Sequence, residues 1–244
     1  MHRRLYIKPP TLFLILSHSC SGEQPYRFAD HVRDERKTNI ADIPPPCQSQ
    51  CSNWASTNEI LATYWSPGDG FDGNGAREYT YGEVTSLGVR QLAHAMNLSS
   101  SSDVVFYDLG SGVGRLVMQM ALDFAPSLKA ATGIELSLER HKIASSILSE
   151  IAWTKPSLTD SVNFLNSDVL ELDLSDATHV YISSLCFPKP VLRQLQDYLF
   201  SIEGLHVVVA LNRLDRFEAE EFDVSDAHVQ MSWGPGLAKV YTRR

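Results

Sequence analysis

The sequence lacks the features that mark several classes of protein. It has only four cysteines in 244 residues, too few for a disulfide-stapled scaffold. A membrane-spanning helix needs about 20 consecutive apolar residues, and an apolar run such as residues 12–16 is far shorter, so we expect no membrane partner. Positive charge is also scarce, because the formal net charge is −8. The chain therefore cannot bind nucleic acid through its overall charge, and its length suits one domain with a short appendage.

The first 24 residues have the outline of a secretory signal but fit it poorly. Basic residues precede an apolar stretch at 11–16, and small polar residues follow at 17–22. A signal needs about 7–15 apolar residues in this position, and here Pro9 and Pro10 abut a stretch of only six. One interpretation is a secretory leader, and the other is a disordered leader or a misassigned start; we favour the latter.

Charge and proline content divide the chain into segments. Residues 1–46 carry a net charge of +2, so the remaining 198 residues carry −10, and the three prolines at 44–46 indicate an extended linker. We therefore predict a disordered tail at 1–46, a helix-and-loop segment at 47–78, and the main domain at 79–244. Cys47 and Cys51 have no second pair of ligands at metal-binding spacing, so we expect no metal site.

Short apolar runs alternate with helical patterns along the main domain. The runs predict strands at 104–109, 130–134, 162–165, 179–182 and 206–211; the helices are predicted at 53–65, 84–96, 116–124, 137–153 and 188–202. Two more strands, at 229–233 and 238–242, flank the turn Gly234-Pro235-Gly236. This order predicts an α/β fold: a mostly parallel, Rossmann-like sheet of seven strands with helices on both faces. The closing antiparallel hairpin favours the class I methyltransferase sheet over the dinucleotide-binding one.

A glycine-rich loop follows the first of these strands. The segment Phe106–Arg115 runs from a hydrophobic strand through Asp108 and three glycines into a helix, which lets the backbone approach a ligand closely. A dinucleotide fingerprint requires glycine or alanine where Arg115 stands. A carboxylate at Asp108 repels a pyrophosphate but attracts a cation, so the loop favours S-adenosylmethionine, which carries an ammonium and a sulfonium and no phosphate.

Two further acids end the next two strands. Glu135 can accept hydrogen bonds from both hydroxyls of a ribose, although an acid there also suits the first turn of the following helix. Asp168 can meet an adenine amino group. Together with Asp108 and the glycine loop, these acids predict a class I methyltransferase that uses S-adenosylmethionine as its cofactor.

Motifs outside the loop carry a resemblance to a known family. Tyr81-Gly82-Glu83-Val84 precedes the glycine strand, and Met231-Ser232-Trp233-Gly234 and Val240-Tyr241 close the chain. With the loop and Gly133-Ile134-Glu135, this set resembles the disruptor-of-telomeric-silencing (Dot) family, the non-SET histone H3 lysine methyltransferases. The resemblance covers residues 79–242 and implies a nuclear, chromatin-regulating histone-lysine N-methyltransferase.

The resemblance also implies which residues form the site. It places cofactor contacts at Tyr81, Gly82, Glu83, Val84, Phe106, Tyr107, Asp108, Leu109, Gly110, Ser111, Gly112, Val113, Gly114, Arg115, Glu135, Asp168 and Val169. It places the acceptor channel at Ser183, Ser184, Phe187, Trp233 and Tyr241; for Phe187 and Trp233, core packing is an equal alternative.

Two features depart from the family pattern. Ser183-Ser184-Leu185-Cys186-Phe187 stands where the family has Asn-Asn-Phe-x-Phe, and Val240 replaces one of two adjacent tyrosines. Family members also hold the nucleosome through a strongly basic segment, which this acidic chain lacks. A histone H3 or nucleosome partner therefore rests on resemblance. The alternatives are a methyltransferase for a non-histone protein or a small molecule, and a cofactor-binding subunit without catalysis.

Overall fold

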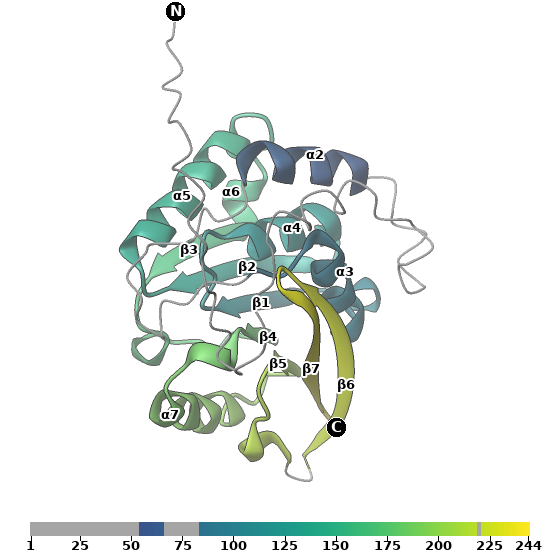
Figure 1. The fold of residues 1–244 in the computed structure, drawn as a ribbon, viewed down its shortest axis with the longest axis vertical. Helices are drawn as coiled ribbons and strands as arrows, with labels where there is room; N and C mark the ends of the chain where they lie inside the picture. Colours follow the sequence, from purple (N-terminus) through teal and green to yellow (C-terminus); the bar gives the residue numbers. More distant parts are fainter. Residues whose placement is uncertain (1–53, 66–82, 219–220) are drawn as a thin grey trace, which may run out of the picture.

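The structure is a computed structural model, and it describes residues 54–65, 83–218 and 221–244 (Figure 1). The predicted tail at 1–46, Cys47, Cys51, Tyr81 and Gly82 lie outside the described residues.

A seven-stranded sheet forms the centre of the domain, with the strand order β3-β2-β1-β4-β5-β7-β6. Its strands are β1 (Val104–Leu109), β2 (Leu128–Glu135), β3 (Val162–Asn166), β4 (His179–Ile182), β5 (Val207–Ala210), β6 (Phe222–Met231) and β7 (Gly234–Arg243). Strands β1 to β5 pair in parallel, whereas β7 runs antiparallel to both β5 and β6. This topology confirms the predicted class I methyltransferase sheet.

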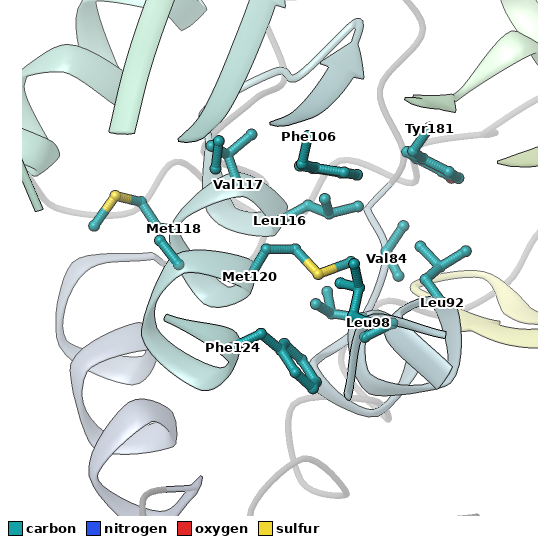
Figure 2. Packing of buried hydrophobic residues seen from close by; sticks show 14 of the residues in the cluster. Val84, Leu92, Leu98, Phe106, Leu116, Val117, Met118, Met120, Phe124 and Tyr181 are labelled. Carbon is teal, nitrogen blue, oxygen red and sulfur yellow. The ribbon is translucent and has the colours of Figure 1, made fainter. Parts of the chain in front are cut away.

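Helices cover both faces of the sheet because its central strands are apolar on both sides, with every residue of β1, β4 and β5 buried. They are α2 (Trp54–Tyr64), α3 (Ser86–Ala95), α4 (Arg115–Phe124), α5 (Leu138–Ala152), α6 (Leu158–Ser161) and α7 (Lys189–Phe200). In β1, Phe106 packs in a hydrophobic cluster with α2 to α5, while Tyr107 and Leu109 pack in a second cluster with α7. Figure 2 shows the first cluster, in which Leu116 and Met120 point from α4 toward Phe106 and Leu98.

The C-terminal hairpin is longer than the sequence predicted, and its turn lies elsewhere. Met231 pairs directly with Gly234, so the turn consists of Ser232 and Trp233, and Gly234-Pro235-Gly236 belongs to β7. The prediction was wrong because the first part of β6 is exposed and polar and gives no apolar signal.

Helix α3 packs directly against the end of this hairpin (Figure 1). Thr85 caps the helix by accepting a hydrogen bond from Gly88 N, and its own N–H and hydroxyl both donate to Gln230 O. A Cβ on Gly88 would lie 2.1 Å from Gln230 O and 2.7 Å from Val84 Cγ1. Only glycine at this position allows the helix to approach the hairpin so closely.

No helix in the described part of the chain is both long and apolar enough to cross a membrane.

We expect Gly88→Ala to destabilise the protein by about 1–3 kcal/mol or more, because the added methyl must displace the backbone of β6. Gly204→Ala is the matched control, since nothing lies within 4 Å of a Cβ there. Denaturant unfolding of the two variants measures the difference. Equal stabilities would contradict the close packing of α3 on the hairpin.

Candidate functional site

A cavity of about 340 Å³ opens where the carboxyl ends of β1, β2 and β4 meet. Parallel strands place their ends at one edge of a sheet, which is where open α/β sheets bind ligands. The cavity wall includes the loop after β1, the turn after β2, the turns after β3 and β4, and the segment before α3.

The glycine loop is tied to β2 through its backbone. The N–H groups of Gly110 and Ser111 both donate to Ile134 O, at 2.9 and 3.0 Å. Gly110 and Gly114 have φ of +92° and +81°, which strain any residue with a side chain. A Cβ on Gly114 would also lie 2.5 Å from Phe164 Cζ. The loop can therefore turn into α4 only if glycine occupies these positions.

Glu135 joins the glycine loop to the start of α5. Its Oε2 accepts a hydrogen bond from Gly112 N and its Oε1 one from Ser137 N, each at 2.8 Å. Arg140 Nη1 lies 3.9 Å from Oε1. A carboxylate has about four acceptor positions, so each oxygen can still accept a hydrogen bond from a ligand in the cavity.

Asp108 places a buried acid in the cavity wall. The residue is 3% exposed, and among the described residues its Oδ1 has no hydrogen-bond partner. Burial, followed by repulsion from Glu135, raises the pKa of Asp108 to about 8. Tyr181 lies opposite on β4, and burial together with Asp108 raises its pKa far above the usual range. Asp108 is thus a group that a bound cation would stabilise in its charged form.

Glu83 and Val84, the described part of the Tyr81–Val84 motif, meet the Met231–Gly234 motif beside the cavity. Glu83 N donates to Ser232 Oγ at 3.1 Å, and Ser232 N donates to Glu83 O at 2.7 Å. Val84 forms an antiparallel bridge with Met231. Arg115, in the loop, pairs with the Glu83 carboxylate at 3.4 Å. The hairpin turn therefore holds the Glu83–Val84 wall of the cavity in place.

Asp168 follows β3 and begins a short 3-10 helix, Val169–Glu171. Its Oδ1 accepts a hydrogen bond from Leu170 N at 3.0 Å, and both Asp168 and Val169 line the cavity. The turn after β3, which carries Asp168 and Val169, lies beside Glu135 and Leu136. It is held there by Asn166 Nδ2, which donates hydrogen bonds to the carbonyls of both residues.

The two serines after β4 have different environments. Ser183 lines the cavity together with Phe187. Ser184 is fully buried and is bound to Asn212: its Oγ accepts a hydrogen bond from Asn212 N, and its carbonyl accepts one from Asn212 Nδ2, both at 2.9 Å. Ser184 thus fixes the turn that carries Ser183 and Phe187.

Trp233 and Tyr241, the other two predicted channel residues, do not line the cavity. Trp233 packs partly buried against the first hydrophobic cluster. Tyr241 is fully buried in the second cluster against Phe217, and its hydroxyl accepts a hydrogen bond from Leu214 N at 2.7 Å. Tyr241 therefore occupies a core position, whereas Trp233 lies in the hairpin turn and is only partly buried.

The remaining predicted residues divide into two groups. Those that line the cavity are Glu83, Val84, Asp108, Gly110, Ser111, Arg115, Glu135, Asp168, Val169, Ser183 and Phe187. Those that lie behind it are Phe106, Tyr107, Leu109, Gly112, Val113, Gly114 and Ser184. Sequence reasoning missed several lining residues: Leu116, Ile134, Leu136, Arg140, Ser167, Tyr181, Pro188 and Val191. Of these, Leu136 and Arg140 follow Glu135 so closely that the turn after β2 could have indicated them.

The cavity fits S-adenosylmethionine. Its volume lies within the range of about 300–1,000 Å³ that small ligands occupy. The partnerless oxygen of Asp108 suits a cationic group, and Glu135 has acceptor positions left for ribose hydroxyls. The two arginines of the wall, Arg115 and Arg140, already pair with acids, which disfavours a phosphate-rich ligand.

Comparisons with known proteins agree with this geometry. A family model described as "Histone methylation protein DOT1" matches residues 74–232. A protein-lysine N-methyltransferase from Saccharolobus islandicus (strain REY15A) is 34% identical over 80 residues, which are 33% of this chain and 45% of that relative. The match thus spans less than half of the relative's length.

Solved structures show the same fold. The methyltransferase domain of bacterial CtHen1-CN superimposes with a TM-score of 0.51 at 15% identity, covering 65% of this chain and 100% of that one. The methyltransferase domain of bacterial CtHen1-C gives a TM-score of 0.51 at 14% identity, covering 65% and 99%.

The family match extends over more than half of the chain and includes the glycine loop, the three strand-end acids and the Ser232 end of the hairpin. The chain therefore has the class I methyltransferase fold with a site that suits S-adenosylmethionine, and it belongs to the DOT1 histone methylation protein family.

Proposed function

We propose that this protein transfers methyl groups to the side-chain amines of lysines in a protein substrate. The observation that carries the proposal is the composition of the cavity wall at the carboxyl end of β4, where Tyr181, Ser183 and Phe187 line the same cavity as the acids that suit the cofactor. The printed name of the Saccharolobus islandicus relative, protein-lysine N-methyltransferase, supports the same acceptor.

The chain's own residues would act mainly by positioning. When bound, S-adenosylmethionine supplies a methyl group on a positively charged sulfur, which an amine can take only through a free lone pair. Burial of the lysine amine next to this positive charge would disfavour its protonated form, so the amine would give up its proton to solvent more easily. None of the described histidines lines the cavity, and no described group of three His, Cys, Asp or Glu residues could hold a metal.

Charge supports a basic protein as the acceptor. Residues 47–244 carry −10, and a negative domain attracts basic proteins and repels nucleic acid. We therefore propose a basic protein such as free histone H3 rather than DNA-wrapped histones as the first substrate to test. Binding of an intact nucleosome would require a separate basic partner.

Methylation assays with radiolabelled S-adenosylmethionine test this function. We expect the full chain to label a basic protein among free histones, nucleosomes and a fractionated lysate, with methyllysine in the labelled protein. Gly110→Arg is the inactive control, because a side chain there is strained and would meet Phe187 at the cavity. Label that appears only in small molecules, or cofactor binding without any turnover, would contradict a protein-lysine acceptor.

The raised pKa of Asp108 predicts that the stability of the folded protein depends on pH. A folded-state pKa of about 8 means that the folded protein holds a proton that the unfolded chain releases above about pH 4. The stability of the cofactor-free protein should therefore fall as pH rises from about 4 to 8. Asp108→Asn keeps the shape and removes this loss, so we expect a melting temperature several degrees higher at pH 7.5.

The same substitution should weaken cofactor binding by about tenfold or more, because it removes a charge that faces a cation. Thermal melts and calorimetry at pH 5 and 7.5 check both effects, and the difference in melting temperature should shrink at the lower pH. A variant that is less stable and binds the cofactor normally would show that Asp108 is a structural acid.

A third prediction separates the two serines. We expect Ser183→Ala to reduce turnover about 5- to 100-fold with cofactor affinity retained, because Ser183 lines the part of the cavity where we propose that the acceptor binds. Ser184→Ala should instead lower the melting temperature, because Asn212 N loses its buried acceptor. Single-turnover rates beside thermal melts make the comparison. The assignment fails if Ser183→Ala turns over normally per folded molecule.

A further inference from the structure

Helix α2 is fixed to the domain although it precedes the segment that the family model matches. Its anchor is Arg90 of α3, which is 1% exposed. Arg90 Nη2 donates to Asn58 Oδ1 at 3.0 Å, its Nε pairs with Asp123 Oδ2 at 3.0 Å, and its guanidinium lies 4.3 Å from the centre of the Trp54 ring. Buried polar groups that are satisfied in this way hold α2 in one position against α3 and α4.

Trp65 connects this helix to the glycine loop. It follows α2 directly, its backbone N–H donates to Leu61 O at 3.0 Å, and its side chain is buried. The indole Nε1 donates to the carbonyl of Val113 at 2.9 Å, across 48 residues of sequence. Val113 lies between Ser111 and Arg115, both of which line the cavity.

The loop therefore has anchors on two sides. From β2, Ile134 O accepts the N–H groups of Gly110 and Ser111, and Glu135 accepts that of Gly112. From α2, Trp65 holds the carbonyl of Val113. Three glycines with positive φ make this loop intrinsically free to adopt other conformations, so each anchor increases the fraction of molecules whose loop is ready for a ligand.

We propose that Trp65 is a positioning residue for the cofactor: its indole N–H holds the Val113 carbonyl, and with it the glycine loop, in the conformation that binds S-adenosylmethionine. If this hydrogen bond is lost, the binding-competent fraction of the loop decreases and the apparent Kd increases in proportion. The inference rests on the cofactor assignment and is independent of the identity of the acceptor.

Trp65→Phe tests the proposal, because phenylalanine keeps an aromatic ring and removes the N–H. Trp54→Phe is a matched control on the same helix: Trp54 is also buried, and its Nε1 has no hydrogen-bond partner among the described residues. We expect Trp65→Phe to raise the Kd for S-adenosylmethionine about three- to tenfold, with kcat at saturating cofactor retained. Trp54→Phe should lower the melting temperature and leave the Kd unchanged.

Two further measurements test the role of Trp65 without relying on enzymatic activity or on the stability of the variant. Amide hydrogen exchange of the peptide that contains residues 110–114 should be faster in Trp65→Phe than in Trp54→Phe. In the wild-type protein labelled at its tryptophan indoles, cofactor binding should shift the NMR resonance of Trp65 and leave that of Trp54 in place.

An equal Kd in the two variants, or a Trp65 resonance that does not respond to the cofactor, would overturn the role of Trp65. A wild-type protein that binds no S-adenosylmethionine would instead overturn the cofactor assignment itself. The two failures are therefore distinguishable.

Discussion

The hydrogen bonds of Glu135 are the constraint on which the rest of the site depends. One carboxylate holds Gly112 of the loop after β1 and Ser137 at the start of α5, so two turns from neighbouring strands share one position. The loop lies against β2 because Ile134 accepts its first two N–H groups. Removing the carboxylate would leave buried donors unpaired and would free both turns. The cavity is thus bounded by backbone turns that one buried carboxylate holds in place.

The site contains acidic groups whose charged forms are poorly stabilised while no ligand is bound. Asp108 and Glu135 repel each other, and Asp108 Oδ1 has no partner in the described part of the chain. A core designed only for stability would contain no such group. A bound cation would offset this cost. The same burial that raises the pKa of Asp108 also strengthens the attraction between its charged form and the cation. Part of the cofactor's binding energy is therefore relief of a cost that is already present in the fold.

Whether a feature could be predicted from the sequence depended on whether it arises from neighbouring residues or from residues far apart in the chain. The apolar runs of β1 and β4 and the glycines of the loop give strong local signals, and the predicted bounds of both strands match the structure. The start of β6 was missed because an exposed edge strand has no apolar face to reveal it. The different environments of Ser183 and Ser184 depend on Asn212, 28 residues away. The contact of Trp65 with Val113 spans 48 residues. Neither contact can be predicted from the residues that surround it in the sequence.

The contacts of Ser184 also bear on the departure from the family pattern. In the family pattern, asparagines occupy the two positions after the fourth strand; here, serines occupy them, and the amide of Asn212, after β5, binds the carbonyl of the second serine. The amide of Asn212 supports this turn from the end of the neighbouring strand. Ser183 lines the cavity and offers a hydroxyl at a position where the family pattern has an amide, and a hydroxyl is smaller and has a single donor. The cavity wall after β4 thus depends on two neighbouring strand ends, because the end of β4 supplies the lining residues and the residue that follows β5 fixes the turn that carries them.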